Sequence, residues 1–537
     1  MKSPIIDRRA SIKWLSAGLL LLLAIHLYQC AFHYFEWLKN PYPNEYREGA
    51  GLHATLLFSE GVNPFKEGAP PTFFYMYGFL YPLVASFFYK TVHTNGFLML
   101  RLISISCLVV TSILVALRAK QMGSAIPSLL IALVILKTGW ITHELVGRPD
   151  QLAMLLSTIC YILLTGSEKI FATTVAAGLL VLTFYTKQYF FFLGLPMMIG
   201  TAFFSLQRAL IFGFVAIFLL VVSLICVDLI YPHYFPMTLL SYGAQPLSVK
   251  HLFRQTGDFF SNFWPLVFLC VFPLIRSPFS LATRSNTNRL YDTNALSWER
   301  MDSPNHLKFW SAQLVGGILL LILIGVVPGA WRTYFNQFLL VPLVFIAAAL
   351  SSSWRETRLF WLSLCTLVIV SLLQVGRSER SLYFTPPLTS AERKSWQEAT
   401  DTALNCGEKI DIRSPLFVKT ALENNLRFFQ NGLQANEWLD LAYDGLKSRS
   451  PKIAQLFRHS ETLLAAGKQY NEDRITAAQI GGGFVVCTDN VSIADEELLL
   501  HQGYQVFSQQ TLRSGRQVWN VKFWRHGSGV DSAGAAL

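Results

Sequence analysis

Long apolar runs recur through most of this chain and then stop. They lie near residues 12–32, 73–92, 98–117, 125–142, 150–166, 170–186, 188–206, 209–230, 259–275, 309–327, 335–351 and 358–376. Crossing a bilayer as a helix takes about 18 or more apolar residues, and most of the runs approach or exceed that length. Only 14% of the residues are charged, against roughly a quarter in soluble domains. We therefore predict an all-α polytopic membrane domain over residues 1–376.

The remaining part, residues 377–537, is rich in charged and amide side chains and has no run long enough to span. Its length is normal for a single soluble domain. Helices are predicted at 389–406 and 436–467, and strands at 410–418, 484–489, 504–512 and 517–525. The last two strands would form a hairpin around Ser514 and Gly515, which predicts a small α/β domain. Cys406 and Cys487 are its two cysteines, and two cysteines alone do not establish a disulfide.

The formal net charge of +11 does not predict nucleic-acid binding, because most Lys and Arg residues lie just outside the apolar runs. Polytopic proteins concentrate such residues on the cytoplasmic side. Lys2, Arg8, Arg9 and Lys13 therefore predict a cytoplasmic N-terminus, with the first run retained as a span. The first loop, 33–72, would then be extracytoplasmic, and it is long, aromatic and acidic.

The segment 73–92 decides the orientation of everything after it. It contains Gly78 and Pro82 and several tyrosines, which suit a membrane interface better than a lipid-facing span. If the segment only dips into the outer leaflet, roughly eleven later basic residues lie inside, against eight if it crosses. The balance favours a juxtamembrane segment, about eleven spans and an extracytoplasmic C-terminal domain.

In that topology several basic residues lie near the outer membrane boundary, where positive charge is usually scarce. They occur in "GRPDQ" (147–151), "TKQ" (186–188) and "WRTYFNQ" (331–337), and Arg101 opens a span. Charges at such depth usually line a cavity and face a partner, and the simplest shared partner is a lipid phosphate. The candidate substrate-binding residues are Arg101, Arg148, Lys187, Gln188, Arg332 and Tyr334.

Each of these residues also has a structural interpretation. Pro149 and Asp150 are typical of a helix start, although they leave Arg148 unexplained. Lys187 could snorkel to the headgroups, Arg101 could be a headgroup anchor, and Arg332 could belong to an interfacial belt.

The acid Glu48 in the first loop precedes an amphipathic stretch. As a helix-start acid it would contribute less than about 1 kcal/mol. As a general base it could take the proton of an acceptor hydroxyl. Glu45, one turn upstream, is the alternative candidate.

The order of these motifs resembles a known family. An acid in "NEYREG", a "NPF…PP…YGFLYP" progression, an arginine opening the next span, "GRPD" and "TKQ" resemble bacterial GT-C type glycosyltransferases that use polyprenyl-phosphate donors. Protein O-mannosyltransferases and lipid A aminoarabinose transferases are distant relatives. The resemblance covers roughly residues 12–376.

The resemblance implies sugar transfer, hexosyl or pentosyl, from a polyprenyl-phosphate donor to a lipid or glycan acceptor of the cell envelope. It places the first-loop acid, Glu48 or Glu45, as the catalytic residue and Asp150 as the second acid. By the same resemblance, Arg101, Arg148 and Lys187 hold the donor phosphate or shape its site, and the chain is a multi-pass protein of the bacterial inner membrane.

The chemistry is consistent with these residues. A polyprenyl phosphate is a good leaving group, so no nucleotide is needed, and "IGGGF" (480–484) lacks the spacing of a dinucleotide loop. A single displacement would invert the anomeric centre. No cofactor is required, although carboxylates at Glu48 and Asp150 would suit a divalent metal. The alternative function is a transporter or flippase of lipid-linked sugars; a structural or receptor-like subunit would explain neither Arg148 nor Lys187.

Overall fold

The computed structural model describes most of the membrane part and a portion of the C-terminal part. The described residues are 14–62 with gaps at 16, 23, 26–27, 29–34, 36–37 and 44–45, then 77–92, 96–121, 147–231, 234, 248–276, 304–325, 333–354, 358–377, 388–406, 410–412, 415–417, 420, 427–428, 484–488, 499–501, 503–514 and 517–527. Glu45, Arg332, the run expected at 125–142 and the helix expected at 436–467 lie outside them.

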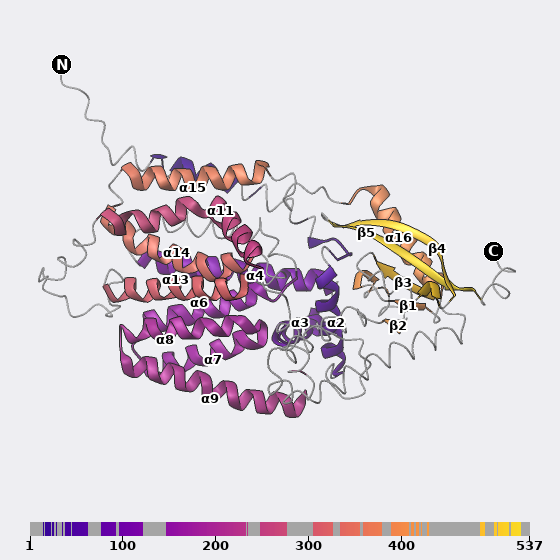
Figure 1. Ribbon diagram of the computed structural model, residues 1–537, viewed down its shortest axis with the longest axis horizontal. Coiled ribbons are helices and arrows are strands. Elements are labelled where there is room, and N and C mark those ends of the chain that lie inside the picture. Colours follow the sequence, from indigo (N-terminus) through magenta and orange to yellow (C-terminus); the bar gives the residue numbers. More distant parts are fainter. Residues whose placement is uncertain are drawn as a thin grey trace, which may run out of the picture.

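Helices make up the first part of the chain, and most of them run side by side along the long axis of the molecule (Figure 1). They are α2 (Tyr46–Glu60), α3 (Leu80–Val92), α4 (Gly96–Gln121), α6 (Asp150–Gly166), α7 (Ile170–Thr186), the 3-10 turn η1 (Gln188–Leu193), α8 (Gly194–Ala202), α9 (Leu206–Ile230), α11 (Val249–Arg276), α13 (Pro304–Gly325), α14 (Thr333–Trp354) and α15 (Arg358–Arg377). α2 and α3 lie at the end of the bundle that faces the sheet (Figure 1).

The helices have the apolar surface of a membrane protein. Within the described residues, three are long and apolar enough to cross a bilayer: Gly96–Gln121, Leu206–Ile230 and Asn305–Ile324. The expected number of about eleven spans is therefore not established. α9 leaves Phe214, Ile217 and Leu229 exposed, as expected for a helix that faces lipid.

The bundle core lies among α6, α8, α13 and α14. Trp310 of α13 stacks on Phe345 of α14, with ring centroids 4.2 Å apart, and Tyr161 of α6 meets the Trp310 ring edge-on. Close helix contacts depend on glycine here. A Cβ on Gly316 would lie 2.4 Å from Pro196 of α8, so the two helices approach at the distance that glycine allows.

Two arginines tie the helices together at the end away from the sheet. Arg118, in the last turn of α4, donates to the carbonyl of Thr165 at the end of α6 (2.8 Å). Arg208, in the first turn of α9, donates to the carbonyls of Leu164 (2.9 Å) and Ser167 (2.5 Å). Arg101 lies near the start of α4 and Arg118 lies near its end, so these two arginines mark opposite ends of the bundle.

The helix α3 accounts for most of the segment predicted to lie at the membrane surface. It has 13 residues and is therefore about 20 Å long, shorter than the roughly 30 Å hydrocarbon core. Gly78, just before it, lies against the end of α7, where a Cβ would be 1.8 Å from the Tyr185 carbonyl oxygen. The juxtamembrane placement stays a prediction, but the length of the helix is compatible with it.

The C-terminal part contains α16 (Ser390–Asn405) and one sheet of order β2-β1-β3-β5-β4. The strands are β1 (Ile410–Ile412), β2 (Arg427–Phe428), β3 (Phe484–Thr488), β4 (Tyr504–Ser514) and β5 (Gln517–His526). β1 pairs in parallel with β2 and β3, whereas β5 is antiparallel to β3 and β4. A capping box between Thr389 and Glu392 starts α16.

The prediction of a small α/β unit is confirmed, with one correction. The helix at 389–406 and the β4–β5 hairpin, closed by the Ser514–Gln517 pair, match the prediction. The strand expected at 410–418 ends at Ile412, and residues 415–417 form a 3-10 turn, η5 (Pro415–Phe417). Pro415 has no N–H to donate to a sheet. Cys406 is a free thiol, and burial raises its pKa to about 11.

Candidate functional site

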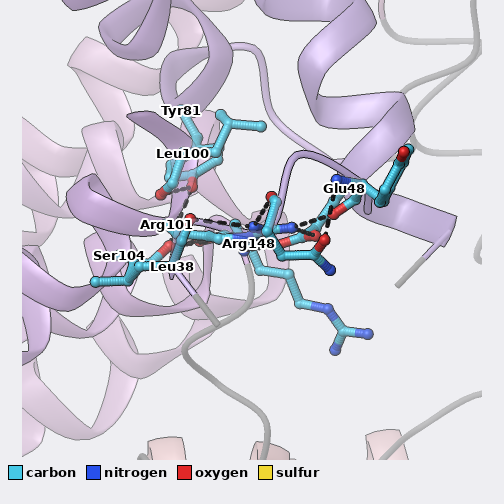
Figure 2. Close-up of polar contacts among 10 residues, drawn as sticks. Leu38, Glu48, Tyr81, Leu100, Arg101, Ser104 and Arg148 are labelled. Atoms are coloured by element: carbon cyan, nitrogen blue, oxygen red, sulfur yellow. Dashed lines mark hydrogen bonds and ion pairs between the residues drawn. The ribbon is translucent and has the colours of Figure 1, made fainter. Parts of the chain in front are cut away.

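Glu48 lies in the first turn of α2 and is fully buried. Its carboxylate accepts two hydrogen bonds from Arg101 of α4, from Nε to Oε1 (3.0 Å) and from Nη2 to Oε2 (2.8 Å) (Figure 2). This is the two-pronged geometry that an arginine fork makes with a carboxylate, and it fixes direction as well as distance. The pair joins the first loop to the start of α4.

Arg101 also binds the chain that leads into α2. Its Nη1 donates to the carbonyls of Leu38 (3.3 Å) and Asn40 (2.7 Å), and its Nη2 donates to that of Tyr42 (2.7 Å). A guanidinium has five N–H donors, and these contacts engage all of them. Arg101 therefore positions both Glu48 and the segment 38–42.

The backbone of "GRPD" supplies a third donor to Glu48. The Gly147 N–H donates to Oε1 at 2.9 Å. A Cβ on Gly147 would lie 2.6 Å from the Leu100 Cβ, so glycine permits this close approach. Ser104 Oγ donates to the Arg148 carbonyl (3.0 Å) and accepts from the Arg148 N–H (3.3 Å), which fastens the motif to α4.

Arg148 itself is buried, and its side chain extends away from the Glu48–Arg101 pair (Figure 2). The second tyrosine of "YGFLYP", Tyr81, donates to the Leu100 carbonyl (2.8 Å) and contacts Ser104 Oγ (3.0 Å). Sequence reasoning missed both Ser104 and Tyr81. The spacing of Ser104, three residues after Arg101 and so on one helix face, was the available signal.

A second buried ion pair lies at the same end of the bundle. Asp150 begins α6, and Lys187 lies between α7 and η1. The Lys187 ammonium binds the Asp150 carboxylate, and both side chains are almost fully buried. The ammonium also lies over the rings of Tyr77 (5.2 Å) and Tyr189 (4.9 Å), where aromatic faces attract a cation.

Gln188 follows Lys187 and is buried, and within the described residues neither atom of its amide has a hydrogen-bond partner. Leaving a buried amide unpaired costs roughly 1–3 kcal/mol. A ligand with hydroxyl groups would remove that cost.

Five of the predicted site residues thus gather at one end of the bundle: Glu48, Arg101, Arg148, Asp150 and Lys187. Glu45 and Arg332 lie outside the described residues, and Tyr334 is placed in α14 without a described side chain. The two carboxylates and three cations sum to one net positive charge in a buried region. Such a region suits an anion, because a buried charge needs a compensating partner.

Metal binding gains no support in the described part of the chain, which has no group of three or more His, Cys, Asp or Glu side chains suited to hold an ion. Glu48 and Asp150 are each paired with a cationic side chain.

Comparisons with solved structures identify the fold. The chain is similar to ArnT from Cupriavidus metallidurans in the apo state, with 11% sequence identity and a TM-score of 0.53 over 96% of this chain and 98% of that one. It is also similar to ArnT from the same organism bound to undecaprenyl phosphate, with 11% identity and a TM-score of 0.52 over 94% and 98% of the chains. No protein-family model and no curated protein matches the sequence. The chain therefore has the overall fold of these ArnT structures, which agrees with the resemblance that the motifs indicated.

Proposed function

We propose that this membrane protein transfers a sugar from a polyprenyl-phosphate-linked donor to a cell-envelope acceptor on the extracytoplasmic face, with Glu48 as general base. The observation that carries the proposal is the cluster of five buried charged side chains at the end of the bundle that faces the C-terminal domain. Its excess of one positive charge suits a phosphate anion. The likeness to an ArnT structure bound to undecaprenyl phosphate supports the same class of lipid.

In the proposed reaction the acceptor hydroxyl oxygen attacks the anomeric carbon of the donor sugar. The bond from that carbon to the phosphate oxygen breaks, and polyprenyl phosphate leaves with the electron pair. The hydroxyl proton passes to Glu48. One displacement of this kind inverts the anomeric centre, and positive charge beside the departing phosphate lowers the barrier.

The cations have different tasks in this proposal. Arg148 and Lys187 bind the donor phosphate, and binding there makes the phosphate share Lys187 with Asp150. Arg101 holds Glu48 in one orientation through its paired hydrogen bonds. The guanidinium and the Gly147 amide occupy three of the roughly four lone-pair positions that a carboxylate offers.

The remaining candidates complete the substrate site. Gln188 has one buried donor group and one buried acceptor, which suits sugar hydroxyl groups. Arg332 and Tyr334 stay proposed substrate ligands, on the strength of the sequence alone. Asp150 stays the second acid, which orients either the acceptor or Lys187.

Purified full-length protein, reconstituted in liposomes, tests the activity. It should release polyprenyl phosphate from polyprenyl-phosphate hexose or pentose donors, and release should depend on added envelope lipid or glycan. The product should carry the anomeric configuration opposite to that of the donor. If the liposomes move intact donor across the bilayer and no panel of acceptors yields polyprenyl phosphate, the protein is a transporter and the proposal is wrong.

A further inference from the structure

A continuous set of contacts joins the C-terminal domain to the Glu48–Arg101 pair, and Tyr42 is its middle member. The Tyr42 ring stacks on the indole of Trp396, with centroids 4.4 Å apart and planes 16° from parallel. The carbonyl of the same residue accepts the 2.7 Å hydrogen bond from Arg101. One residue therefore offers its ring to the domain and its backbone to the site.

Trp396 is a rigid surface for this stack. It lies on α16 and is 1% exposed. Its indole N–H donates to the Arg513 carbonyl of β4 at 2.8 Å, and its ring meets Trp519 of β5 edge-on. Movement of the indole would therefore require movement of the helix and the hairpin together.

The C-terminal domain packs against α2 and α4 through apolar side chains. Leu52 of α2 and Leu100 of α4 share one buried cluster with Trp396 and Phe417. Burial also raises the pKa of the Tyr42 phenol, and the charges of Arg393 and Asp401 on α16 act on it as well. Tyr42 thus lies against α16 with a neutral ring.

We propose that the C-terminal domain positions the Glu48–Arg101 pair through the Trp396–Tyr42 stack, so that docking of the domain sets the geometry of the site. Tyr42 and Trp396 are positioning residues that act through Arg101. The catalytic consequence rests on the function proposed above, whereas the coupling itself rests on the contacts alone.

The effect of losing the Trp396–Tyr42 stack depends on the hydrogen bonds that Arg101 makes. Three of its five hydrogen bonds go to the carbonyls of Leu38, Asn40 and Tyr42. Loss of the stack frees that segment, and the guanidinium then turns away from Glu48 to follow it. A displacement of about 1 Å in a catalytic group costs up to roughly a hundred-fold in rate.

Hydrogen exchange at the Gly147 amide measures the coupling without an assay of activity, because this amide donates a hydrogen bond to Glu48. In purified full-length protein, Tyr42→Ala and Trp396→Ala should speed exchange in a peptide that contains Gly147. Tyr42→Phe keeps the ring and the carbonyl, so it should exchange like the wild type.

Turnover supplies the second measurement. Tyr42→Ala and Trp396→Ala should lower kcat by up to roughly a hundred-fold with little change in donor KM, because the donor phosphate is bound elsewhere. Tyr42→Phe should keep the kcat of the wild type. A merely structural role for Tyr42 would not predict this rescue together with the Gly147 response.

Trp524→Ala is the matched control. Trp524 is equally buried in the same domain, but it belongs to a separate cluster with Val485, Leu499 and Tyr504. Unchanged Gly147 exchange in Tyr42→Ala, or an equal effect of Trp524→Ala and Trp396→Ala, would overturn the inference. If Gly147 responds as expected but the wild type releases no polyprenyl phosphate, the coupling stands and the proposed function fails.

Discussion

At the scale of single residues, Glu48 has two roles that a substitution would disturb together. The proposed reaction needs its carboxylate to take a proton, and the fold needs its charge to neutralise the buried Arg101. Removing one member of a buried pair leaves the other uncompensated, which costs about 3–5 kcal/mol. A test of Glu48 as general base must therefore measure turnover and folding stability separately.

The variant Glu48→Gln should lower turnover by about a hundred- to ten-thousand-fold, because the amide cannot accept the proton. It should also unfold more easily, for the reason given above. Adding Arg101→Met removes the uncompensated cation but also the hydrogen bonds to the Leu38, Asn40 and Tyr42 carbonyls. The double variant should therefore regain stability only in part and should regain no turnover. Thermal unfolding and donor cleavage measure the two effects.

The control for this series is Glu60→Gln, at the exposed end of the same helix. It should match the wild type in both assays. A fully active Glu48→Gln enzyme would contradict the general-base role, and loss of activity in Glu45→Gln instead would move that role one turn upstream.

The second pair, Asp150 and Lys187, predicts a different pattern. Lys187→Met leaves a buried carboxylate without its ammonium, at a cost of about 3–5 kcal/mol. The double variant with Asp150→Asn should recover most of that loss. If Lys187 binds the donor phosphate, Lys187→Met should bind the donor more weakly than the wild type, and the double variant should bind it no better.

Donor KM and melting temperature, measured side by side, distinguish these effects. Lys169→Met is the matched control, because Lys169 is exposed at the opposite end of α7. Normal donor KM in Lys187→Met would reduce Lys187 to a structural ion-pair partner.

Much of the residue-level site was predictable, but the pairings were not. The sequence pointed to Arg101, Arg148 and Lys187 because charges are costly at membrane depth, and to Glu48 because it precedes an amphipathic stretch in the first loop. It predicted that Arg101 and Lys187 hold the donor phosphate or shape its site, but it did not predict that each would pair with an acid. Which cation meets which acid depends on how four separate helices pack, and local sequence does not carry that information.

At the scale of elements, the site is assembled where helices begin or end. Glu48 and Asp150 lie in the first turns of α2 and α6, and Lys187 follows the last residue of α7. Negative side chains at helix N-termini are favoured by the helix dipole. The positions of these ends depend on close backbone contacts such as that of Gly78 with Tyr185.

Gly78→Ala should disrupt this assembly, because the added Cβ would meet the Tyr185 carbonyl oxygen at 1.8 Å. Backbone must move, and the nearest movable element carries Lys187. We expect a lower melting temperature and weaker donor binding. Gly257→Ala is the control, since nothing lies within 4 Å of its Cβ position in α11; alanine there favours the helix by up to about 1 kcal/mol. A Gly78→Ala protein with wild-type stability would show that α3 and α7 do not meet as described.

Local patterns predicted the elements that local interactions determine. The capping box of α16 and the β4–β5 hairpin both depend on residues close in sequence. β2 has only two residues and pairs in parallel with β1. Its formation therefore depends on residues distant in the sequence, and two residues are too few to show an alternating apolar pattern.

At the scale of the whole molecule, the site and the C-terminal domain occupy one end of the bundle, and the Arg118 and Arg208 contacts occupy the other. The two ends must face opposite sides of a membrane that the helices cross. Basic residues concentrate on the cytoplasmic side, so the Arg118 and Arg208 end is expected inside. The site and the C-terminal domain are then outside, where envelope acceptors are found.

Reporters at the two ends test this orientation. A reporter that works only in the cytoplasm should be silent after residue 537 and active when inserted between the exposed residues Glu168 and Lys169, in the turn between α6 and α7. A reporter that works only outside the cytoplasm should give the reverse. The pair matters because each result has its own meaning. If both signals are exchanged, the site faces the cytoplasm and the extracytoplasmic acceptor is wrong, although the chemistry at Glu48 can stand. If both positions report the same side, the helices between them do not cross as a bundle, and the shared face of Glu48, Asp150 and Lys187 is lost with it.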